Sequence, residues 1–415
     1  MDDHWLRIAA AVILSALVLQ ALAAAWRGVA RARYERSRQG LMLERWRLEL
    51  AAAEARNAAI ERARSGWQGY RKFELSEVVE EAEGYRSFLF RPHDGRPLPP
   101  FLPGQYLTLR LNLPGESKPA VRCYSLSDAP RPDTYRITVK LLCYTDQGGR
   151  PREGRVSGHL HHHLRPGEIV DLKAPAGEFH PDPLHERPLV LIAGGVGVTP
   201  FLSLITDLAE RGDPREVWLF HGVRDGGEQL MKERLAALAA AHPPLRLRVC
   251  HSRPVAGARP GVDYHHAGRI DLELLRAELP SSNYDFFLCG PPAMMAALPA
   301  ALRDWGVPAE SIHTEAFGPA SLRSGEAPAE AARKVRFARG GKEARWRGGS
   351  LLELAEGNGV TIDSGCRAGN CGACLTAVKA GAVEYLSEPG FQAEAGSCLP
   401  CVCAPAAGGE LVLDA

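Results

Sequence analysis

The sequence has no excess of charge of either sign. Its 415 residues carry 50 Lys and Arg against 49 Asp and Glu, a formal net charge of +1. Nucleic-acid-binding proteins usually show a basic excess, so the composition gives no support for nucleic acid as a partner. The chain also lacks an evident internal repeat, and its 10 cysteines do not form a small disulfide framework. Its length fits about two to four globular domains.

The cysteines lack the spacing of a zinc site, which usually has two C-x2-C pairs or added histidines. They follow C-x4-C-x2-C at Cys366, Cys371 and Cys374, and a fourth candidate, Cys401, lies near the C-terminus. This spacing is typical of a plant-type [2Fe–2S] cluster, in which four thiolates hold two irons. Small residues between the cysteines allow backbone N–H groups to approach the sulfurs. The pattern predicts a one-electron carrier, with a disulfide pair or a zinc site as the alternatives.

Polar residues are nearly absent from Ile8 to Trp26. A helix of this length reaches about 28 Å, close to the ~30 Å hydrocarbon thickness of a bilayer. Arginines are frequent at positions 27–38, so the positive-inside bias predicts a single-pass inner-membrane anchor over residues 1–28 with the catalytic domains in the cytoplasm. A cleavable signal peptide ending near residues 21–23 and a soluble or interfacial helix are the alternatives.

Residues 29–66 lack the regular apolar spacing of a coiled coil. From Arg31 to about Arg64 they are rich in Ala, Glu, Arg and Leu, which favours one long polar helix. This composition predicts a stalk between the anchor and the remaining domains. A helix that binds a partner or dimerises is the alternative interpretation.

Short alternating runs with Gly and Pro turns replace the helical pattern after residue 66. Tyr106–Leu111 and Tyr135–Leu141 alternate polar and apolar residues as β-strands do. These runs predict an antiparallel β-barrel over residues 67–183.

Apolar strands alternate with helices over residues 184–319, which predicts a parallel α/β sheet. The chain is rich in Ser, Gly, Pro and Ala at residues 320–333, a predicted linker to a C-terminal domain of residues 334–415. The predicted elements of the α/β sheet are strands Pro188–Ala193, Val217–Phe220 and Tyr284–Leu288, and helix Phe201–Arg211.

Arg122-Cys123-Tyr124-Ser125 lies between two predicted strands and supplies three groups that a bound flavin needs. A cation can hold a phosphate, an aromatic ring can pack on the isoalloxazine, and polar groups can bind the ribityl chain. Strand alternation puts Arg122 and Tyr124 on one face. Gly154-Arg155-Val156-Ser157 could hold a diphosphate with backbone N–H groups at the start of a helix over His159–Leu164.

Four histidines, His159, His161, His162 and His163, fall in that helix. His159 would share a face with His162 and with His163, so a metal site is one interpretation. Surface or capping histidines are the other.

The first α/β strand is not followed by the G-x-G-x-x-G motif of dehydrogenases. It is followed by Gly195-Val196-Gly197-Val198-Thr199-Pro200, whose glycines allow the backbone to approach a pyrophosphate at a helix N-terminus. Pro200 suits the first helical turn. Cys289-Gly290-Pro291 ends a later strand, at the edge where open α/β sheets bind ligands. A buried structural thiol is the alternative for Cys289.

In this order the motifs resemble those of the ferredoxin–NADP reductase superfamily, above all the reductase portion of flavohemoglobins and of oxygenase reductases. Residues 334–415 resemble a plant-type ferredoxin, where a proline commonly follows the last ligand by four positions. Pro405 therefore favours Cys401 over its neighbours Cys398 and Cys403 as the fourth ligand. The resemblance is carried by F-L-P-G-Q-Y at 101–106, R-C-Y-S-L-S-D at 122–128, G-R-V-S at 154–157, A-P-A-G-E-F at 174–179, E-A-F-G-P at 315–319 and L-P-C-V-C-A-P at 399–405.

The resemblance implies an antiparallel FAD-binding β-barrel, a parallel α/β NAD(P)-binding domain, and a β-grasp ferredoxin domain of the α+β class. With the N-terminal transmembrane helix and helical stalk predicted above, these domains make a multidomain fold. It implies that Tyr124, Ser125, Cys289 and Phe317 shape hydride transfer, with core packing as the alternative for Phe317. The residues implied to bind FAD or the nicotinamide cofactor are Arg122, Tyr124, Ser125, Val139, Lys140, Gly154, Val156, Ser157, Gly194, Gly195, Gly197, Thr199, Pro200, Cys289, Gly290, Pro291 and Phe317.

The sequence therefore predicts a membrane-anchored reductase that passes electrons from NAD(P)H to FAD, then to the [2Fe–2S] cluster, and then to an external acceptor such as an oxygenase or a cytochrome. NADH is slightly favoured over NADPH. Two alternatives remain open: a soluble oxygenase reductase, and a redox-sensing or scaffolding protein. A self-contained nitric oxide dioxygenase is not expected, because residues 1–66 are too short to form a globin.

Overall fold

The computed structural model describes residues 66–415, apart from 117–118, 146–148, 184, 318–332, 370, 387–388 and 390, together with isolated helical positions between residues 19 and 50. The chain divides into two units, residues 1–63 and 64–415. The predicted anchor, stalk and linker fall mostly outside the described residues. Within the described part of the chain, we find no helix that is long and apolar enough to cross a membrane.

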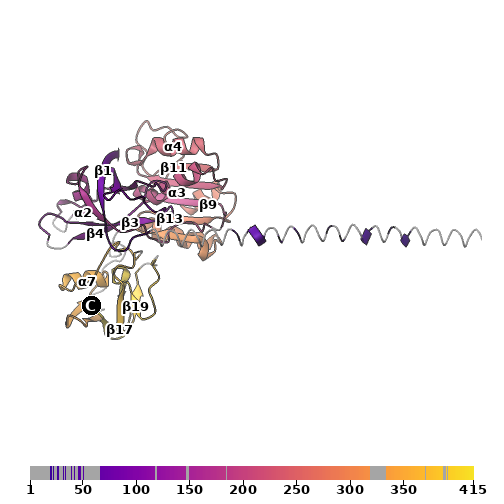
Figure 1. Ribbon diagram of the computed structural model, residues 1–415. Helices are drawn as coiled ribbons and strands as arrows, with labels where there is room; N and C mark the ends of the chain where they lie inside the picture. Colours follow the sequence, from indigo (N-terminus) through magenta and orange to yellow (C-terminus); the bar gives the residue numbers. More distant parts are fainter. Residues whose placement is uncertain are drawn as a thin grey trace, which may run out of the picture. The chain divides into compact units, whose positions relative to one another are not determined.

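The first domain of the larger unit is an antiparallel sheet of six strands in the order β4-β3-β8-β1-β2-β5 (Figure 1). An isolated bridge from Leu126, directly after β4, to Ile137 within β5 joins the two edge strands, so the sheet curls into a barrel as predicted. The elements are β1 (Arg71–Ala82), β2 (Tyr85–Pro92), β3 (Tyr106–Leu111), β4 (Ala120–Ser125), β5 (Tyr135–Lys140), β8 (Ile169–Leu172), the hairpin β6 (Cys143–Thr145) and β7 (Pro151–Glu153), and helix α2 (Arg155–His162).

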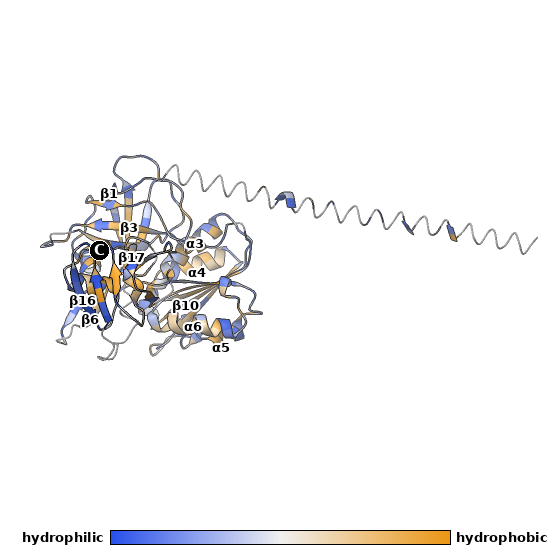
Figure 2. Ribbon diagram, turned by 90° about the horizontal axis from the view of Figure 1, so that it is seen from below, coloured by the Kyte–Doolittle hydropathy of each residue, from blue (hydrophilic) through white to orange (hydrophobic). Residues whose placement is uncertain are grey.

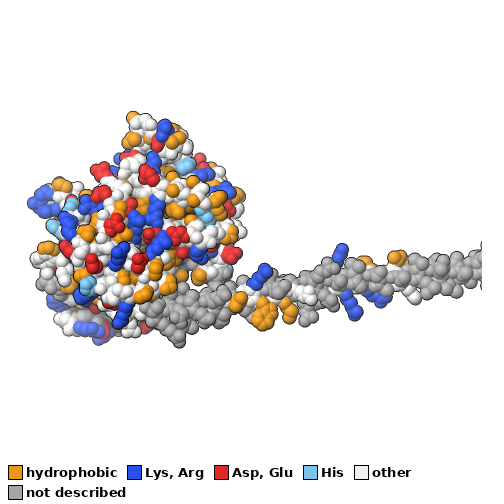
Figure 3. Space-filling model, turned by 45° about the horizontal axis from the view of Figure 1, so that its top comes forward, with side chains coloured by type: hydrophobic (Ala, Val, Ile, Leu, Met, Phe, Trp, Pro, Cys, Tyr) orange, Lys and Arg blue, Asp and Glu red, His pale blue; other side chains and the backbone are white. Residues whose placement is uncertain are grey.

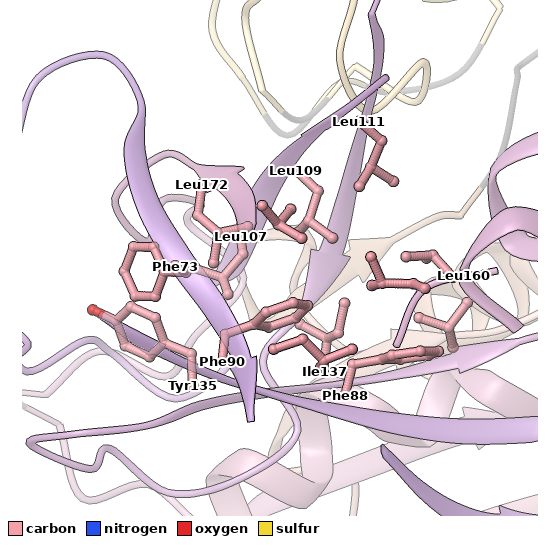
Figure 4. Packing of buried hydrophobic residues seen from close by; sticks show 14 of the residues in the cluster. Phe73, Phe88, Phe90, Leu107, Leu109, Leu111, Tyr135, Ile137, Leu160 and Leu172 are labelled. Carbon is pink, nitrogen blue, oxygen red and sulfur yellow. The ribbon is translucent and has the colours of Figure 1, made fainter. Parts of the chain in front are cut away.

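Alternation along these strands builds the barrel core. Leu107 and Leu109 of β3 point inward and are fully buried, whereas Arg110 between Leu109 and Leu111 stays half-buried. The inward residues pack against aromatic rings and Ile137 from the facing strands, as Figure 4 shows. The predicted strand Tyr106–Leu111 is confirmed at both ends.

The second domain is a six-stranded parallel sheet in the order β12-β11-β10-β9-β13-β14. Helices α3 and α4 cover one face of this sheet and α5 and α6 the other (Figure 2). The elements are β9 (Leu189–Gly194), the 3-10 turn η1 (Gly195–Val198), α3 (Thr199–Glu210), β10 (Val217–Val223), η2 (Gly226–Glu228), α4 (Lys232–Ala241), β11 (Leu245–His251), β12 (His266–Ala267), α5 (Leu272–Glu278), β13 (Asp285–Cys289), α6 (Pro292–Asp304), η3 (Ala309–Ser311) and β14 (Ile312–Glu315).

The predicted strand–helix alternation of this domain is confirmed, with shifts of one to three residues at the ends. The chain moves outward from β9 to β12 and then returns to place β13 on the other side of β9. In open α/β sheets this reversal opens a crevice at the carboxyl ends of the strands, where ligands bind.

The C-terminal domain is a mixed sheet in the order β16-β15-β21-β17-β19 with one helix, α7. Ser350 and Glu353 form a capping box that fixes where α7 begins. A mixed sheet packed on one helix is an α+β arrangement, the class predicted for this domain. The elements are β15 (Arg333–Phe337), β16 (Lys342–Trp346), α7 (Leu351–Gly357), β17 (Thr376–Ala380), β18 (Val383–Tyr385), β19 (Ser397–Cys398), η6 (Pro400–Val402), β20 (Cys403–Pro405) and β21 (Leu411–Leu413).

Two isoleucines of the barrel provide a test of this core. Ile137 is fully buried, whereas Ile169 in the same sheet is 42% exposed. Ile137→Ala should lower the free energy of unfolding by about 2–5 kcal/mol because it leaves a cavity, and Ile169→Ala should cost clearly less. Denaturant unfolding followed by circular dichroism measures both, and equal losses would contradict the assignment of the core.

Candidate active site

A cavity of about 570 Å³ lies between the barrel strands, the start of α2 and the segments that follow β9 and β14. It gathers side chains that are far apart in the sequence, and most of its lining is apolar. Ten of the predicted cofactor-binding residues line it: Arg122, Tyr124, Ser125, Val139, Lys140, Gly154, Val156, Ser157, Thr199 and Phe317.

Strand β4 supplies a cation and an aromatic ring to the cavity. Tyr124 packs against the barrel core, and burial raises the pKa of its phenol. Arg122 is half-buried and donates a hydrogen bond of 2.7 Å to the carbonyl of Val121. Within the described residues we find no ion pair for Arg122, although burial and the nearby Arg367 lower the pKa of its guanidinium. A guanidinium in this setting fits the phosphate of a flavin.

The turn before α2 fits a diphosphate. A Cβ at residue 154 would lie 2.7 Å from Ser157 Oγ and 3.0 Å from Leu142 Cβ, so a side chain there would force these two residues to shift. Ser157 Oγ donates to the carbonyl of Gly154 at 3.2 Å and accepts from the N–H of Leu142 at 3.2 Å. The first intrahelical bond runs from the N–H of Gly158 to the carbonyl of Gly154, and the N–H of Gly154 itself bonds the carbonyl of Leu142. The N–H groups of residues 155–157, in the first turn of the helix, can therefore bind an anion.

Helix α2 begins at Arg155, four residues before the predicted start at His159. The prediction was wrong there because Gly154, with its extended backbone, is the N-cap residue. Two of the histidines have hydrogen-bond partners in the protein: His161 is buried with Nε2 3.0 Å from the carbonyl of Val139, and His162 Nε2 lies 2.8 Å from Glu153.

Glu315 at the end of β14 is a site residue that was not predicted. Its side chain is buried, and Ser125 Oγ donates a hydrogen bond of 3.3 Å to its carboxyl. Burial raises the pKa of Glu315 to about 8, while the bond from Ser125 acts in the opposite direction. The carboxyl is therefore mainly protonated at neutral pH and can itself donate a hydrogen bond. The only sequence signal for it was its place in the E-A-F-G-P segment.

The glycine loop after β9 packs directly against the end of β13. Cys289 of β13 pairs with Ala193 of β9 in the sheet. A Cβ at residue 197 would lie 2.0 Å from the Cys289 carbonyl oxygen, and a Cβ at residue 194 would lie 2.4 Å from Pro291 Cδ. The structure thus brings the two predicted nicotinamide segments together at the sheet reversal. The segments comprise Gly194, Gly195, Gly197, Thr199 and Pro200 on one side and Cys289, Gly290 and Pro291 on the other.

The predicted nucleotide loop also borders the flavin cavity. Val196, Thr199 and Pro292 line the cavity together with Tyr124. Phe317, which is 37% exposed, lines it as well. A nicotinamide bound at the sheet reversal would therefore lie within reach of a ring packed on Tyr124.

The cysteines of the C-terminal domain lie in two pairs. Cys374 Sγ is 3.3 Å from Cys401 Sγ, and the N–H of Cys366 donates to Cys371 Sγ at 3.2 Å. A Cβ at residue 365 would lie 2.8 Å from Cys371 Sγ, so only glycine allows this approach. No three His, Cys, Asp or Glu side chains of the described residues surround a single ion position. Two thiolate pairs are what a dinuclear cluster requires, two for each iron.

The neighbouring thiols Cys398 and Cys403 hydrogen-bond to each other inside the core of the C-terminal domain. This arrangement leaves Cys401 beside Cys374, as the resemblance implied.

The cluster loop touches the flavin cavity. Cys366 and Arg367 line it, and Cys123 of β4 forms hydrogen bonds with the sulfurs of Cys366 and Cys371. Arg367 adopts a positive φ of 57° and pairs with Glu356. Neither Cys123 nor Arg367 was predicted as a site residue, because both matter only through the packing of two domains.

Comparison with known proteins agrees with this division into domains. Residues 72–180 match an oxidoreductase FAD-binding domain, residues 191–299 an oxidoreductase NAD-binding domain, and residues 340–406 a 2Fe-2S iron-sulfur cluster binding domain. These matches lie on the barrel, the parallel sheet and the C-terminal domain respectively.

Relatives extend the likeness across the domains. The flavohemoprotein of Bordetella pertussis is 39% identical over 279 residues, 67% of this chain and 66% of the relative. The chain spans 62–66% of the length of the flavohemoproteins it matches first. The FAD/NAD-binding domain of nitric oxide dioxygenase from Vibrio cholerae is 32% identical, with a TM-score of 0.52. The match covers 60% of this chain and 99% of that domain.

Phthalate dioxygenase reductase, described as modular for electron transfer from pyridine nucleotides to [2Fe-2S], is 26% identical with a TM-score of 0.54. The match covers 84% of this chain and 98% of that protein. The chain therefore belongs to the ferredoxin–NADP reductase family and carries a C-terminal [2Fe–2S] domain. It is an oxidoreductase that binds FAD, a nicotinamide cofactor and a [2Fe–2S] cluster.

Glu315 makes the stability of this site dependent on pH. The folded state retains a proton up to about pH 8, whereas the unfolded carboxyl releases it near its ordinary pKa of 4.5. Stability should therefore fall as the pH rises between these values, with a slope of up to about 1.4 kcal/mol per pH unit. Glu315→Gln, which stays neutral, should flatten this slope. Unfolding at several pH values measures it, with the exposed Glu178→Gln as control, and an unchanged slope in Glu315→Gln would contradict the assignment.

Proposed function

We propose that the protein is a membrane-anchored reductase that delivers electrons from NAD(P)H to a separate oxygenase component. The observation that carries the proposal is that one cavity is lined both by the flavin residues of β4 and by Cys366 of the cluster loop. Bound FAD supplies the conversion of a two-electron hydride into single electrons. The contiguity of the two sites gives those electrons a short route to the C-terminal domain.

The chain's own residues prepare the hydride step by alignment. Tyr124 and Val196 both line the cavity, and the close packing of Gly197 on Cys289 fixes where the nicotinamide segments lie. Ser125 and the protonated Glu315 place hydrogen-bond donors in a buried, largely apolar environment. No acid–base step is needed for hydride transfer, so orientation and exclusion of water dominate.

An oxygenase component as the acceptor is supported by the likeness to phthalate dioxygenase reductase, which covers 84% of this chain and 98% of that protein. NADH as the donor is supported by the segment after β10. There Arg224 pairs with Glu228, and Asp225 accepts a hydrogen bond from the N–H of Gly227 at 2.9 Å. A 2′-phosphate would need free cations at this place, and acidic groups instead favour the free ribose hydroxyl.

Substituting one predicted ligand should separate the two halves of the electron path. Cys401→Ser should keep NAD(P)H-dependent reduction of ferricyanide by the flavin but lower reduction of cytochrome c by at least about tenfold, because the cluster lacks a thiolate. Cys143→Ser, at an exposed thiol outside the cluster loop, is the control. Rates are measured with NADH and NADPH separately. Equal losses of both activities in Cys401→Ser, or none, would contradict the proposed path.

Membrane attachment through residues 8–26, with the catalytic domains in the cytoplasm, belongs to the same proposal. It is supported by the exposure of Leu19, Leu22 and Trp26, at 66%, 62% and 74%. The full-length protein should sediment with inner membranes and be released by detergent but not by high salt, whereas a chain without residues 1–28 should stay in the supernatant. Full-length protein in the supernatant would instead favour a soluble oxygenase reductase.

The face of the molecule in Figure 3 shows no large patch of a single charge that would suggest a different function. Basic and acidic side chains are interspersed there, in keeping with the net charge of +1. A single-sign field for steering a highly charged polymer is not seen on that face.

A further inference from the structure

Cys123 lies on β4 beside the flavin residues and contacts the cluster loop. In the pairing of β3 with β4, Thr108 lies opposite Cys123, while Leu107 and Leu109 lie opposite Tyr124 and Arg122. Successive side chains of a strand alternate, so Cys123 lies on the same side of the sheet as Thr108 rather than that of Leu107 and Leu109. It lines the flavin cavity together with Cys366 and Arg367 of the cluster loop.

The contact between Cys123 and the cluster loop is direct. The Cys123 thiol forms hydrogen bonds with the sulfurs of Cys366 and Cys371. A Cβ at residue 365 would lie only 3.7 Å from Cys123 Sγ. This distance is an ordinary van der Waals contact, so residue 365 of the cluster loop lies directly beside the Cys123 sulfur.

The chemistry of the ligands sets the direction of these hydrogen bonds. As iron ligands Cys366 and Cys371 are thiolates, which accept hydrogen bonds but cannot donate them. The shared proton must then belong to Cys123. Thr108 Oγ1 lies 3.3 Å from Cys123 Sγ, and with the thiol proton directed at the loop, the Thr108 hydroxyl is the donor in that contact.

We propose that Cys123 is a positioning residue for electron transfer, whose S–H group donates to the Cys366–Cys371 thiolate pair. The bond holds the cluster loop against the flavin strand and stabilises the negative charge that the pair bears more strongly after reduction. Hydrogen bonds to ligand sulfurs raise the reduction potential of an iron–sulfur site. This inference rests on the proposed function, since it concerns the same path.

The test uses the full-length protein with its flavin and cluster, titrated potentiometrically and followed by EPR. Cys123→Ala should shift the one-electron equilibrium about tenfold toward the oxidised form, a fall of about 59 mV in midpoint potential. Cys123→Ser retains a donor and should recover most of the shift. Cys250→Ala removes a buried thiol of the α/β sheet and should leave the potential unchanged. The flavin potential should not move in any of them.

A second variant tests the hydrogen bond between Thr108 and Cys123. Thr108→Val removes the hydroxyl that orients the thiol and should lower the potential in the same direction by a smaller amount. Midpoint potentials in Cys123→Ala and Thr108→Val that match Cys250→Ala would overturn the inference. Should Cys123→Ala fail to retain the cluster, the Ser and Val variants decide the question.

The two proposals fail in different ways. A wild-type protein without a reducible EPR signal or without flavin would overturn the proposed function. A normal wild-type signal whose potential is insensitive to residues 123 and 108 would overturn only the role of Cys123.

Discussion

The register between β3 and β4 is the constraint on which both redox sites depend. Leu107 and Leu109 are fully buried in the barrel core, so they fix which residues of β4 lie opposite them. A slip of one residue would exchange the faces of β4 and displace Arg122 and Tyr124 from their present positions in the cavity lining. The same slip would turn Cys123 away from the cluster loop. Packing of two leucines thus decides where a flavin and a cluster can lie relative to one strand.

Close backbone approach is the second constraint, and it acts in the α/β domain. Cβ positions at residues 194 and 197 fall 2.4 and 2.0 Å from atoms of the segment after β13. Any side chain there would separate the two segments at the sheet reversal. The glycines are therefore needed for the domain's own packing as well as for a pyrophosphate, and the two requirements cannot be told apart from the motif alone.

Local patterns carried most of what could be predicted. Tyr106–Leu111 alternates cleanly and is a strand with those ends, and the C-x4-C-x2-C run needs only its own loop to bring Cys366 and Cys371 together. Contacts between distant segments left weaker signals. Glu315 meets Ser125 across 190 positions, and Cys123 meets Cys366 only because two domains pack there. The predicted anchor stays a prediction, because most of it lies outside the described residues.

Two kinds of charged group line the cavity. Ser125 bonds the Glu315 carboxyl, which burial keeps mainly protonated, so this pair carries little net charge. Arg122 and Arg367 also line the cavity, and the nearby Arg367 of the cluster loop helps to lower the pKa of the Arg122 guanidinium. An anion between two such guanidinium groups relieves their repulsion. A flavin phosphate held by both guanidinium groups would therefore couple flavin binding to the position of the cluster loop, and this coupling would be reciprocal.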